Sequence, residues 1–276
     1  MSRTLQESRR RYAAAICREA GVTSPTVKRA FATVPRESFL TPPPWTIFSP
    51  GGMMEASTSD PVDLYQDVLV VLDRSRGINN GQPSLHAAWL AAVAPGSGDG
   101  ALQIGAGTGY YTALLAELVG PKGGVEAYEI EEELAALAMD HLAAFPQVNL
   151  QARSGIGPAM PEADVIYVNA GLSAPDPTWL RALRLGGRLI FPWQPSEMRA
   201  GVAMLVTRLA GGFSVLPIMP VRFIPCLGVH ARAGATDRTS EDAIWRTRSV
   251  WLGAERAPDA TATFAEDAVW FSSDPV

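Results

Sequence analysis

The chain has 276 residues, of which 47% are hydrophobic and 18% are charged, and its net charge is −5. This length suffices for one large buried core, and the charge gives no sign of a nucleic-acid binder. The two cysteines, Cys17 and Cys226, fit neither a metal site nor a disulfide framework. The sequence shows no signal peptide and no apolar run near the roughly 18 residues of a membrane-spanning helix. These features predict a soluble, cytoplasmic protein without a membrane partner.

The N-terminal part predicts helices followed by loop. Two helices fit the pattern between residues 5 and 33, and Ser24 and Pro25 are suited to begin the second. Residues 41–60 are rich in Pro, Gly, Ser and Thr, which predicts a loop. The run DVLVVLD, from Asp67 to Asp73, is a short β-type segment.

From Gly100 onward, strand and helix patterns alternate. Strands are predicted at ALQIG, GGVEAYEI, VNLQAR, ADVIYVNAG and GGRLIFPW, and helices at TGYYTALLAELVG, EEELAALAMDHLAAF and TWLRALRL. Such alternation predicts an α/β fold with a mostly parallel sheet and helices on both faces. Residues 201–228 then predict a β-hairpin that turns at Gly211-Gly212 and forms an antiparallel edge. Residues 231–276 are less regular and are predicted to pack on the domain as an appended segment.

A glycine loop, IGAGTGYY, follows the first strand of the alternating region and opens a helix. Its glycines let the backbone turn sharply and approach a ligand, and the helix presents free N–H groups. A dinucleotide fingerprint needs G-x-G-x-x-G/A, but the sixth position counted from Gly105 is Tyr110. The G-x-G-x-G spacing instead resembles the loop of S-adenosylmethionine-dependent methyltransferases.

Glu129 ends the second strand of this region, where a carboxylate can accept hydrogen bonds from ribose hydroxyls. The structural alternative is a glycine turn beside a solvated glutamate. Gln103 stands where methyltransferases usually have Asp or Glu, so the resemblance implies weaker or differently arranged cofactor binding. Asn169 ends the fourth strand, where ligands meet open α/β sheets, or it caps a loop. The predicted S-adenosylmethionine-binding residues are Gln103, Gly105, Ala106, Gly107, Thr108, Gly109, Glu129, Ile130, Ser154, Gly155 and Asn169.

An ordered set of segments resembles the protein-L-isoaspartate O-methyltransferase family. The set comprises VKRAFATVPRESFL, LYQDVLVV with GINNGQP, LQIGAGTGYYTALLAELVG, GGRLIFPW and VRFIPCLG, and it covers residues 22–229. The resemblance implies a seven-stranded Rossmann-like sheet with S-adenosylmethionine at the carboxyl edge of the strands. It also implies a helical and loop region on the substrate side (1–76), a cofactor-binding core (77–230) and an appended C-terminal segment (231–276).

Two segments depart from the family's pattern. GINNGQP resembles the family's substrate-side loop G-Q-T-I-S-Q-P, so the family's Thr and Ser correspond to Asn79 and Gly81. The loop serine, to which an active-site role is credited in the family, is therefore absent. Arg153-Ser154-Gly155 stands where the family shows Gly-Asp-Gly. Divergent relatives methylate carboxylates in ribosomally made peptides, and their loops also change at these positions. The departures weaken isoaspartate repair more than methyl transfer.

Methyl transfer to a carboxylate needs alignment more than a base. A carboxylate with a pKa near 4 is already ionised at neutral pH, and positioning alone can supply several kcal/mol. The candidate catalytic residues of the loop are Asn79, Asn80, Gly81, Gln82, Ser84 and His86. Structural alternatives are a plain turn at residues 79–81, a bond from Ser84 to the first helical turn and a buried core histidine at position 86.

Three functions fit these patterns. The first is an S-adenosylmethionine-dependent carboxyl O-methyltransferase that acts on a protein or peptide of isoaspartate type. The second is a methyltransferase for a small molecule or a natural-product peptide, which the substitutions at Asn79 and Gly81 favour. The third is a non-catalytic binding module on a methyltransferase fold. No metal ion is required by any of them.

Overall fold

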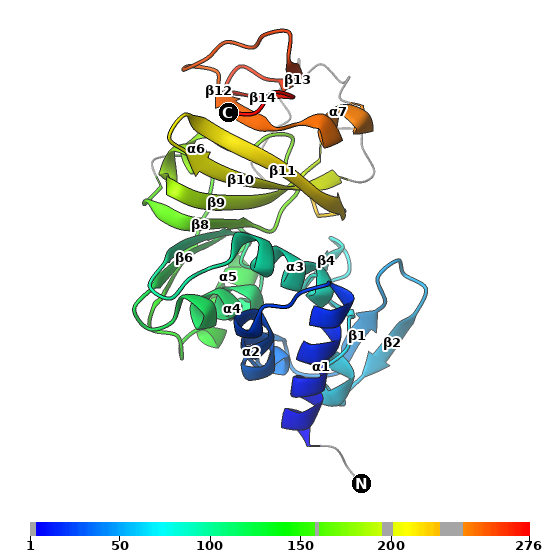
Figure 1. Cartoon of the computed structure of the whole chain (residues 1–276). Coiled ribbons are helices and arrows are strands. Elements are labelled where there is room, and N and C mark those ends of the chain that lie inside the picture. Colours follow the sequence, from blue (N-terminus) through cyan, green and yellow to red (C-terminus); the bar gives the residue numbers. More distant parts are fainter. Residues whose placement is uncertain (1–3, 158–159, 195–200, 227–239) are drawn as a thin grey trace. The chain divides into compact units, whose positions relative to one another are not determined.

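The computed structural model describes residues 4–157, 160–194, 201–226 and 240–276 (Figure 1). The chain forms two compact units. Unit 1 comprises Met1–Gly98 and Ala106–Ala152, and unit 2 comprises Asp99–Gly105 and Arg153–Val276. The boundary between them crosses the glycine loop between Gly105 and Ala106. No helix among the described residues is long and apolar enough to cross a membrane.

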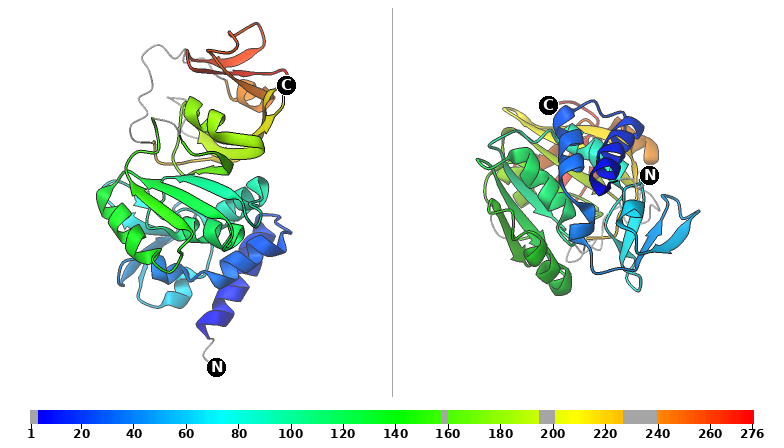
Figure 2. Two further views of the ribbon diagram at one scale, coloured as in Figure 1. Left: turned by 90° about the vertical axis from the view of Figure 1, so that its left-hand side faces the viewer. Right: turned by 90° about the horizontal axis from the view of Figure 1, so that it is seen from below.

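Helices make up much of unit 1. Both predicted N-terminal helices are confirmed: Ser24 caps the second by accepting the Val27 N–H, and the two helices pack against each other (Figure 2). The α-helices of unit 1 are α1 (Leu5–Glu19), α2 (Pro25–Thr33), α3 (Pro83–Val93), α4 (Tyr110–Val119) and α5 (Glu132–His141), and its 3₁₀ helices are η1 (Arg36–Phe39) and η2 (Pro61–Leu64).

A small antiparallel sheet includes the predicted β-type run at Asp67–Asp73, which is confirmed, and two strands within residues 41–60, which were predicted to be loop. Its order is β2-β1-β3-β4, with β1 at Trp45–Phe48, β2 at Glu55–Thr58, β3 at Leu69–Asp73 and β4 at Ile78–Asn79. The loop prediction for residues 41–60 was therefore wrong, because their Pro and Gly content hid a short alternation. Trp45 and Ile47 point inward and pack with Leu64, Val68 and Val70 in a buried cluster.

Unit 1 also holds a parallel strand pair. β6 (Gly124–Glu129) pairs with β7 (Val148–Ala152), and α4 and α5 contact β6. The interior positions of β6, including Ala127 and Tyr128, are buried. This pairing fixes Glu129 at the carboxyl end of a rigid strand.

Unit 2 is built on one sheet that changes from parallel to antiparallel. β5, β8 and β9 are parallel neighbours, and β9, β10 and β11 are antiparallel. This confirms the predicted alternation and the predicted hairpin. The elements of unit 2 are β5 (Gly100–Ile104), β8 (Ala163–Val168), α6 (Pro177–Ala182), β9 (Leu183–Trp193), β10 (Gly201–Leu209), β11 (Gly212–Val221), α7 (Glu241–Arg246), β12 (Ser249–Leu252), β13 (Ala262–Ala265) and β14 (Val269–Ser272).

The C-terminal segment continues this sheet, so the strand count differs from the expected seven. The order runs on from β11 through β12 and β14 to β13, which means that the hairpin β10–β11 is not the edge. Phe271 and Trp270 are fully buried in β14. The expectation that this segment packs on the domain is confirmed for its described residues, and its regular structure was missed because the strands are only four residues long.

Candidate functional site

The part of the glycine loop that lies in unit 1 is hydrogen-bonded directly to the candidate ribose carboxylate. The backbone N–H of Gly107 donates to Glu129 Oε2 at 2.7 Å, and the N–H of Ala106 donates to Tyr128 O at 3.1 Å. Glu129 Oε1 accepts the Glu131 N–H at 3.0 Å. The side chain is not solvated, since the residue is only 6% exposed. The loop and the Glu129 carboxylate are therefore hydrogen-bonded to each other, which differs from the alternative of a glycine turn beside a solvated glutamate.

Burial is the main influence on the pKa of Glu129 and raises it above the ordinary glutamate value, while the backbone N–H groups oppose this shift. The carboxylate accepts the backbone N–H groups of Gly107 and Glu131, and the Ile130 N–H also interacts with it. A carboxylate has about four lone-pair sites, so it can still accept from a hydroxyl donor. Ile130, the next candidate, is 42% exposed at the end of the strand.

Local structure explains which residue types occupy the other positions of the glycine loop. Gly105, Gly107 and Gly109 all have positive φ, at 78°, 57° and 95°. A Cβ at Gly109 would lie 3.0 Å from Leu142 Cδ1, whereas a Cβ at Gly107 would meet nothing within 4 Å. Packing thus requires glycine at 109, and backbone conformation favours it at 107. Thr108 is buried, and its carbonyl lies 2.9 Å from His141 Nδ1.

Two buried amides lie at the carboxyl ends of neighbouring strands in unit 2. Gln103 in β5 is fully buried, and neither polar atom of its side chain has a hydrogen-bond partner among the described residues. Asn169 follows β8, and its Oδ1 is likewise buried without a partner in the described part of the chain. The Asn169 backbone N–H donates to Ile104 O at 2.8 Å. Unsatisfied buried amides cost free energy, so this pair fits a polar ligand.

Ser154 and Gly155 are engaged in local structure. Ser154 Oγ accepts the Ile156 N–H at 3.1 Å. Gly155 O accepts the indole N–H of Trp179 at 2.8 Å, which ties α6 to this loop. Their proposed contact with the cofactor stays a prediction.

The loop at residues 79–81 is a hydrogen-bonded turn, as the structural alternative predicted. Asn79 Oδ1 accepts the Gly81 N–H at 2.9 Å, which is an Asx turn. Asn80 faces inward: its Oδ1 accepts from Arg36 Nη2 at 3.0 Å and from the Val70 N–H at 2.9 Å. Asn79 Nδ2 makes only a 3.5 Å contact with Gly77 O. The Nδ2 donor of Asn80 has no partner among the described residues but is buried, whereas the contact of Asn79 Nδ2 lies in an exposed part of the loop.

Arg36 is a structural residue that sequence reasoning passed over, although it lies in the quoted VPRE motif. Its side chain is fully buried. Besides Asn80, the guanidinium donates to the carbonyls of Leu64 at 2.8 Å, Gln66 at 3.4 Å and Val68 at 2.6 Å. These acceptors are all neutral. Arg36 thus holds the chain before β3 and the turn after β4 in one arrangement.

Asp67 is the second residue that was missed. Its Oδ2 accepts from Gln82 Nε2 at 2.8 Å and from Ser84 Oγ at 2.7 Å, and its Oδ1 accepts the Ser84 N–H at 2.7 Å. Asp67 therefore satisfies the first turn of α3, in place of the Ser84 side chain. The predicted donors Gln82 and Ser84 are already paired with this carboxylate. Asp67 lies in the quoted LYQDVLVV, and its distance in sequence from Ser84 hid its function.

His86 is a buried ring rather than an exposed base. It is 2% exposed and stacks on Tyr111, with the ring centroids 3.6 Å apart. The Tyr111 hydroxyl donates to Gly81 O at 3.3 Å. Burial, and after it the Arg36 charge, lowers the pKa of His86 to about 3. The imidazole is therefore neutral at physiological pH, which agrees with the core-histidine alternative.

Replacing His86 with glutamine is expected to remove part of the chain's acid sensitivity. The unfolded chain binds a proton at this histidine below its ordinary pKa of about 6.5, whereas the folded chain does so only near a pKa of about 3. The wild type therefore loses stability as the pH falls through this window, by up to about 1.4 kcal/mol per pH unit. Urea unfolding of both proteins at pH 7, 5 and 4 measures this, and a constant difference between them at all three pH values would contradict it.

Comparison with known proteins gives a consistent match. The family described as Protein-L-isoaspartate(D-aspartate) O-methyltransferase (PCMT) matches residues 11–231. A Protein-L-isoaspartate O-methyltransferase 2 from Anaeromyxobacter sp. is 30% identical over 227 residues, which cover 80% of this chain and 84% of that protein. A Protein-L-isoaspartate O-methyltransferase from Thermotoga maritima is 31% identical over 173 residues, which cover 60% of this chain but only 50% of that protein.

A solved structure supports the fold over nearly the whole chain. A protein-L-isoaspartate O-methyltransferase structure aligns with a TM-score of 0.66 at 23% identity, covering 96% of this chain and 88% of that chain. This confirms the predicted α/β fold of Rossmann-like methyltransferase type. The alignment reaches further than the family match, so part of the C-terminal segment has a counterpart in that structure.

Proposed function

This chain belongs to the protein-L-isoaspartate(D-aspartate) O-methyltransferase family, and we propose that it transfers a methyl group from S-adenosylmethionine to a carboxylate of a protein or peptide, with an isoaspartyl residue as the acceptor. The observation that carries this proposal is the bond between the Gly107 N–H and the buried Glu129 carboxylate. It supports a nucleoside site that is held ready before the cofactor arrives.

The residues present fit this cofactor. Glu129 would accept hydrogen bonds from the ribose hydroxyls. Gln103, through both amide atoms, and Asn169, through its Oδ1, would bind polar groups of the cofactor, because these atoms are buried without partners in the described chain. When bound, the cofactor supplies an electrophilic methyl group on its sulfonium. Gln103 would offer a neutral amide where an acid is usual, so cofactor binding would depend on hydrogen bonds there rather than on charge.

The chemistry of the loop fits a carboxylate acceptor. Such an acceptor is ionised at neutral pH and needs no base, and His86 is neutral and buried. What the reaction requires is an acceptor held in line with the methyl group. Asn79 would hold it, because its Nδ2 makes only a long, exposed contact with Gly77 O, whereas the unpaired Nδ2 of Asn80 is buried. The other predicted donors, on Gln82 and Ser84, would position the loop through Asp67.

The test is methyl-ester formation on an isoaspartyl peptide and on the matched aspartyl peptide. Transfer to the isoaspartyl peptide alone is expected. Glu129→Gln is expected to weaken binding of S-adenosylhomocysteine by about 10- to 100-fold, since each hydrogen bond to a charged group contributes about 1.5–3 kcal/mol. Calorimetric titration measures this affinity. The control is Glu126→Gln, because Glu126 lies in the same strand but not at its carboxyl end. Unchanged affinity in Glu129→Gln would exclude the proposed ribose contact.

A second acceptor class is favoured by one observation. A Cβ at Gly81 would lie 2.5 Å from His86 Nε2, so the loop has no room for the side chain that the family carries there. In this second candidate function, the acceptor is a different peptide carboxylate or a small-molecule acid. Cofactor binding without transfer to the isoaspartyl peptide would favour this alternative, and turnover with any acceptor would exclude a purely binding function.

Three further points stay predictions: the division of the chain at residues 1–76, 77–230 and 231–276, the cytoplasmic location and the lack of a nucleic-acid partner.

A further inference from the structure

The loop after β8 in unit 2 is held from several sides. It begins at Asn169 and continues through Gly171 to Ser173. The Gly171 N–H donates to Ile224 O at 2.8 Å, and the Leu172 N–H donates to Pro192 O at 3.0 Å. A Cβ at Gly171 would lie 2.5 Å from Gln194 Nε2, so the loop backbone lies directly against its neighbours. Its conformation therefore depends on the residues at the end of β9.

Trp193 is the side chain through which this loop is connected to the C-terminal segment. It is fully buried at the end of β9, and its indole N–H donates to Ser173 O at 2.5 Å. On its other side it stacks on Phe271, with centroids 4.5 Å apart and planes at 23°. Phe264 meets it edge-on at 5.3 Å. One indole thus contacts both the loop and the strands β13 and β14.

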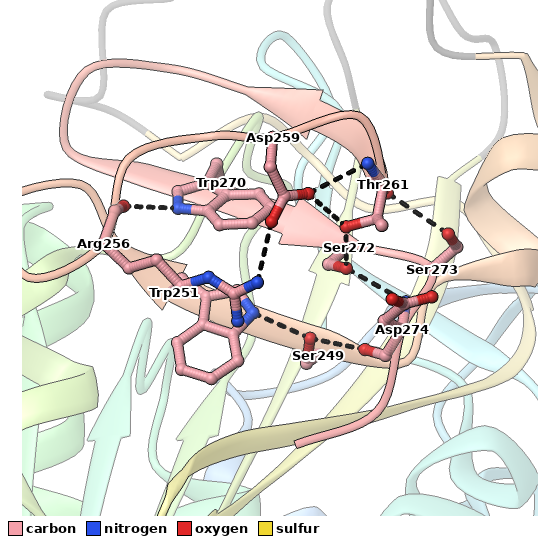
Figure 3. Close-up of polar contacts among 9 residues, drawn as sticks. All are labelled: Ser249, Trp251, Arg256, Asp259, Thr261, Trp270, Ser272, Ser273 and Asp274. Carbon is pink, nitrogen blue, oxygen red and sulfur yellow. Dashed lines mark hydrogen bonds and ion pairs between the residues drawn. The ribbon is translucent and has the colours of Figure 1, made fainter.

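Phe264 and Phe271 lie outside the family match, which ends at residue 231, whereas Trp193 lies within it. The strands that carry them are braced by a separate cluster on the other face, drawn in Figure 3. There the Arg256 guanidinium lies 4.3 Å from the Trp251 ring and 5.3 Å from the Trp270 ring, and it pairs with Asp259 at 2.7 Å. The register pairs Trp251 with Trp270 and Val250 with Phe271. Because side chains alternate along a strand, Phe271 faces Trp193 while Trp251 belongs to the opposite face.

We propose that Phe271 and Trp193 are positioning residues that fix the loop from Asn169 to Ser173 for methyl transfer. The aromatic stack prevents the indole from tilting, and the indole N–H holds Ser173, so the loop that begins with Asn169 keeps one conformation. The role of Asn169 in this inference rests on the proposed function. The appended segment then acts on the reaction through the loop, without touching substrate or cofactor.

The test compares Trp193→Phe and Phe271→Leu with Trp251→Leu in the full chain. Trp193→Phe removes the bond to Ser173 but keeps an aromatic ring, and Phe271→Leu removes the stack but keeps an apolar side chain. Amide hydrogen exchange at Gly171 and Leu172 is expected to speed up about 10-fold in both variants, which corresponds to about 1.4 kcal/mol. Trp251→Leu, on the opposite face of the same segment, is expected to leave this exchange unchanged. Because exchange needs no acceptor, it decides the inference even if no peptide is methylated.

Kinetics give the second readout. With an accepted substrate, Trp193→Phe is expected to raise the KM for S-adenosylmethionine about 10-fold with a smaller change in kcat, because the displaced loop carries Asn169, one of the proposed cofactor-binding residues. Phe271→Tyr, which keeps the ring, is expected to retain slow exchange. The inference would be overturned if Gly171 and Leu172 exchanged at the wild-type rate in both Trp193→Phe and Phe271→Leu. It would also be overturned if Trp251→Leu increased the exchange rate equally.

Discussion

Replacing Arg36 with methionine is expected to lower the free energy of unfolding by about 3–5 kcal/mol. The guanidinium donates at 2.8 Å to Leu64 O and at 2.6 Å to Val68 O, and it also holds Asn80. Methionine fills a similar volume but leaves these buried oxygens without donors, and each unsatisfied group costs about 1–3 kcal/mol. Urea unfolding measures the loss. The free energy of unfolding of Arg36→Lys is expected to lie between those of the wild type and of Arg36→Met, because a lysine ammonium can replace only some of the guanidinium donors.

Arg10→Met is the control, since Arg10 is an exposed residue of α1. A surface change of this kind should stay within about 0.5 kcal/mol. Equal effects of Arg36→Met and Arg10→Met would show that Arg36 does not organise the segment before β3.

Replacing Gly81 with serine is expected to lower the free energy of unfolding by about 2–4 kcal/mol. The single change is therefore not expected to restore the loop that the family has at this position. Gly81 has φ +76°, where an L residue costs about 1–2 kcal/mol. In addition, its Cβ would lie 2.5 Å from His86 Nε2 and 3.2 Å from Tyr111 Cε2. The imidazole cannot retreat easily, because Tyr111 stacks on it at 3.6 Å.

Two comparisons separate the backbone cost from the steric cost. Gly77 has φ +68° and a Cβ there would meet nothing within 4 Å, so Gly77→Ser should show the backbone cost alone. The double variant Gly81→Ser/His86→Ala should be less destabilised than the sum of its single changes, by at least about 1 kcal/mol. Strict additivity, measured by urea unfolding, would refute the contact. This double variant is also the proper test of whether a loop serine increases methylation of an isoaspartyl peptide.

The loop shows where sequence reasoning succeeded and where it could not. The turn at residues 79–81 follows from local chemistry, since Asn side chains accept nearby backbone N–H groups. The partners Arg36 and Asp67, in contrast, are brought to the loop by tertiary structure. No spacing rule connects Asp67 with Ser84, and the family resemblance directed attention to the missing serine rather than to the carboxylate that caps α3.

A similar contrast applies to the rest of the chain. The alternating strands and the position of Glu129 at the end of one of them could be predicted, because a parallel sheet imposes long, regular patterns. The strands β12, β13 and β14 could not, since each has only four residues. Their stability comes from contacts such as Phe271 on Trp193, which no local pattern reveals.

The short pairing between β11 and β12 has a consequence for solubility. These strands pair only at Phe213–Val250 and Ser214–Ser249, so the remainder of the ten-residue β11 has no further strand partner on that side among the described residues. An open strand of this length is a template for aggregation through edge-to-edge pairing. The Val215 N–H points to that side, where it donates to Arg248 O at 2.7 Å. By alternation the nitrogen of Pro217 faces the same way and carries no hydrogen. The proline therefore removes a donor where a second chain would need one, which protects a concentrated solution of the protein from strand-mediated association.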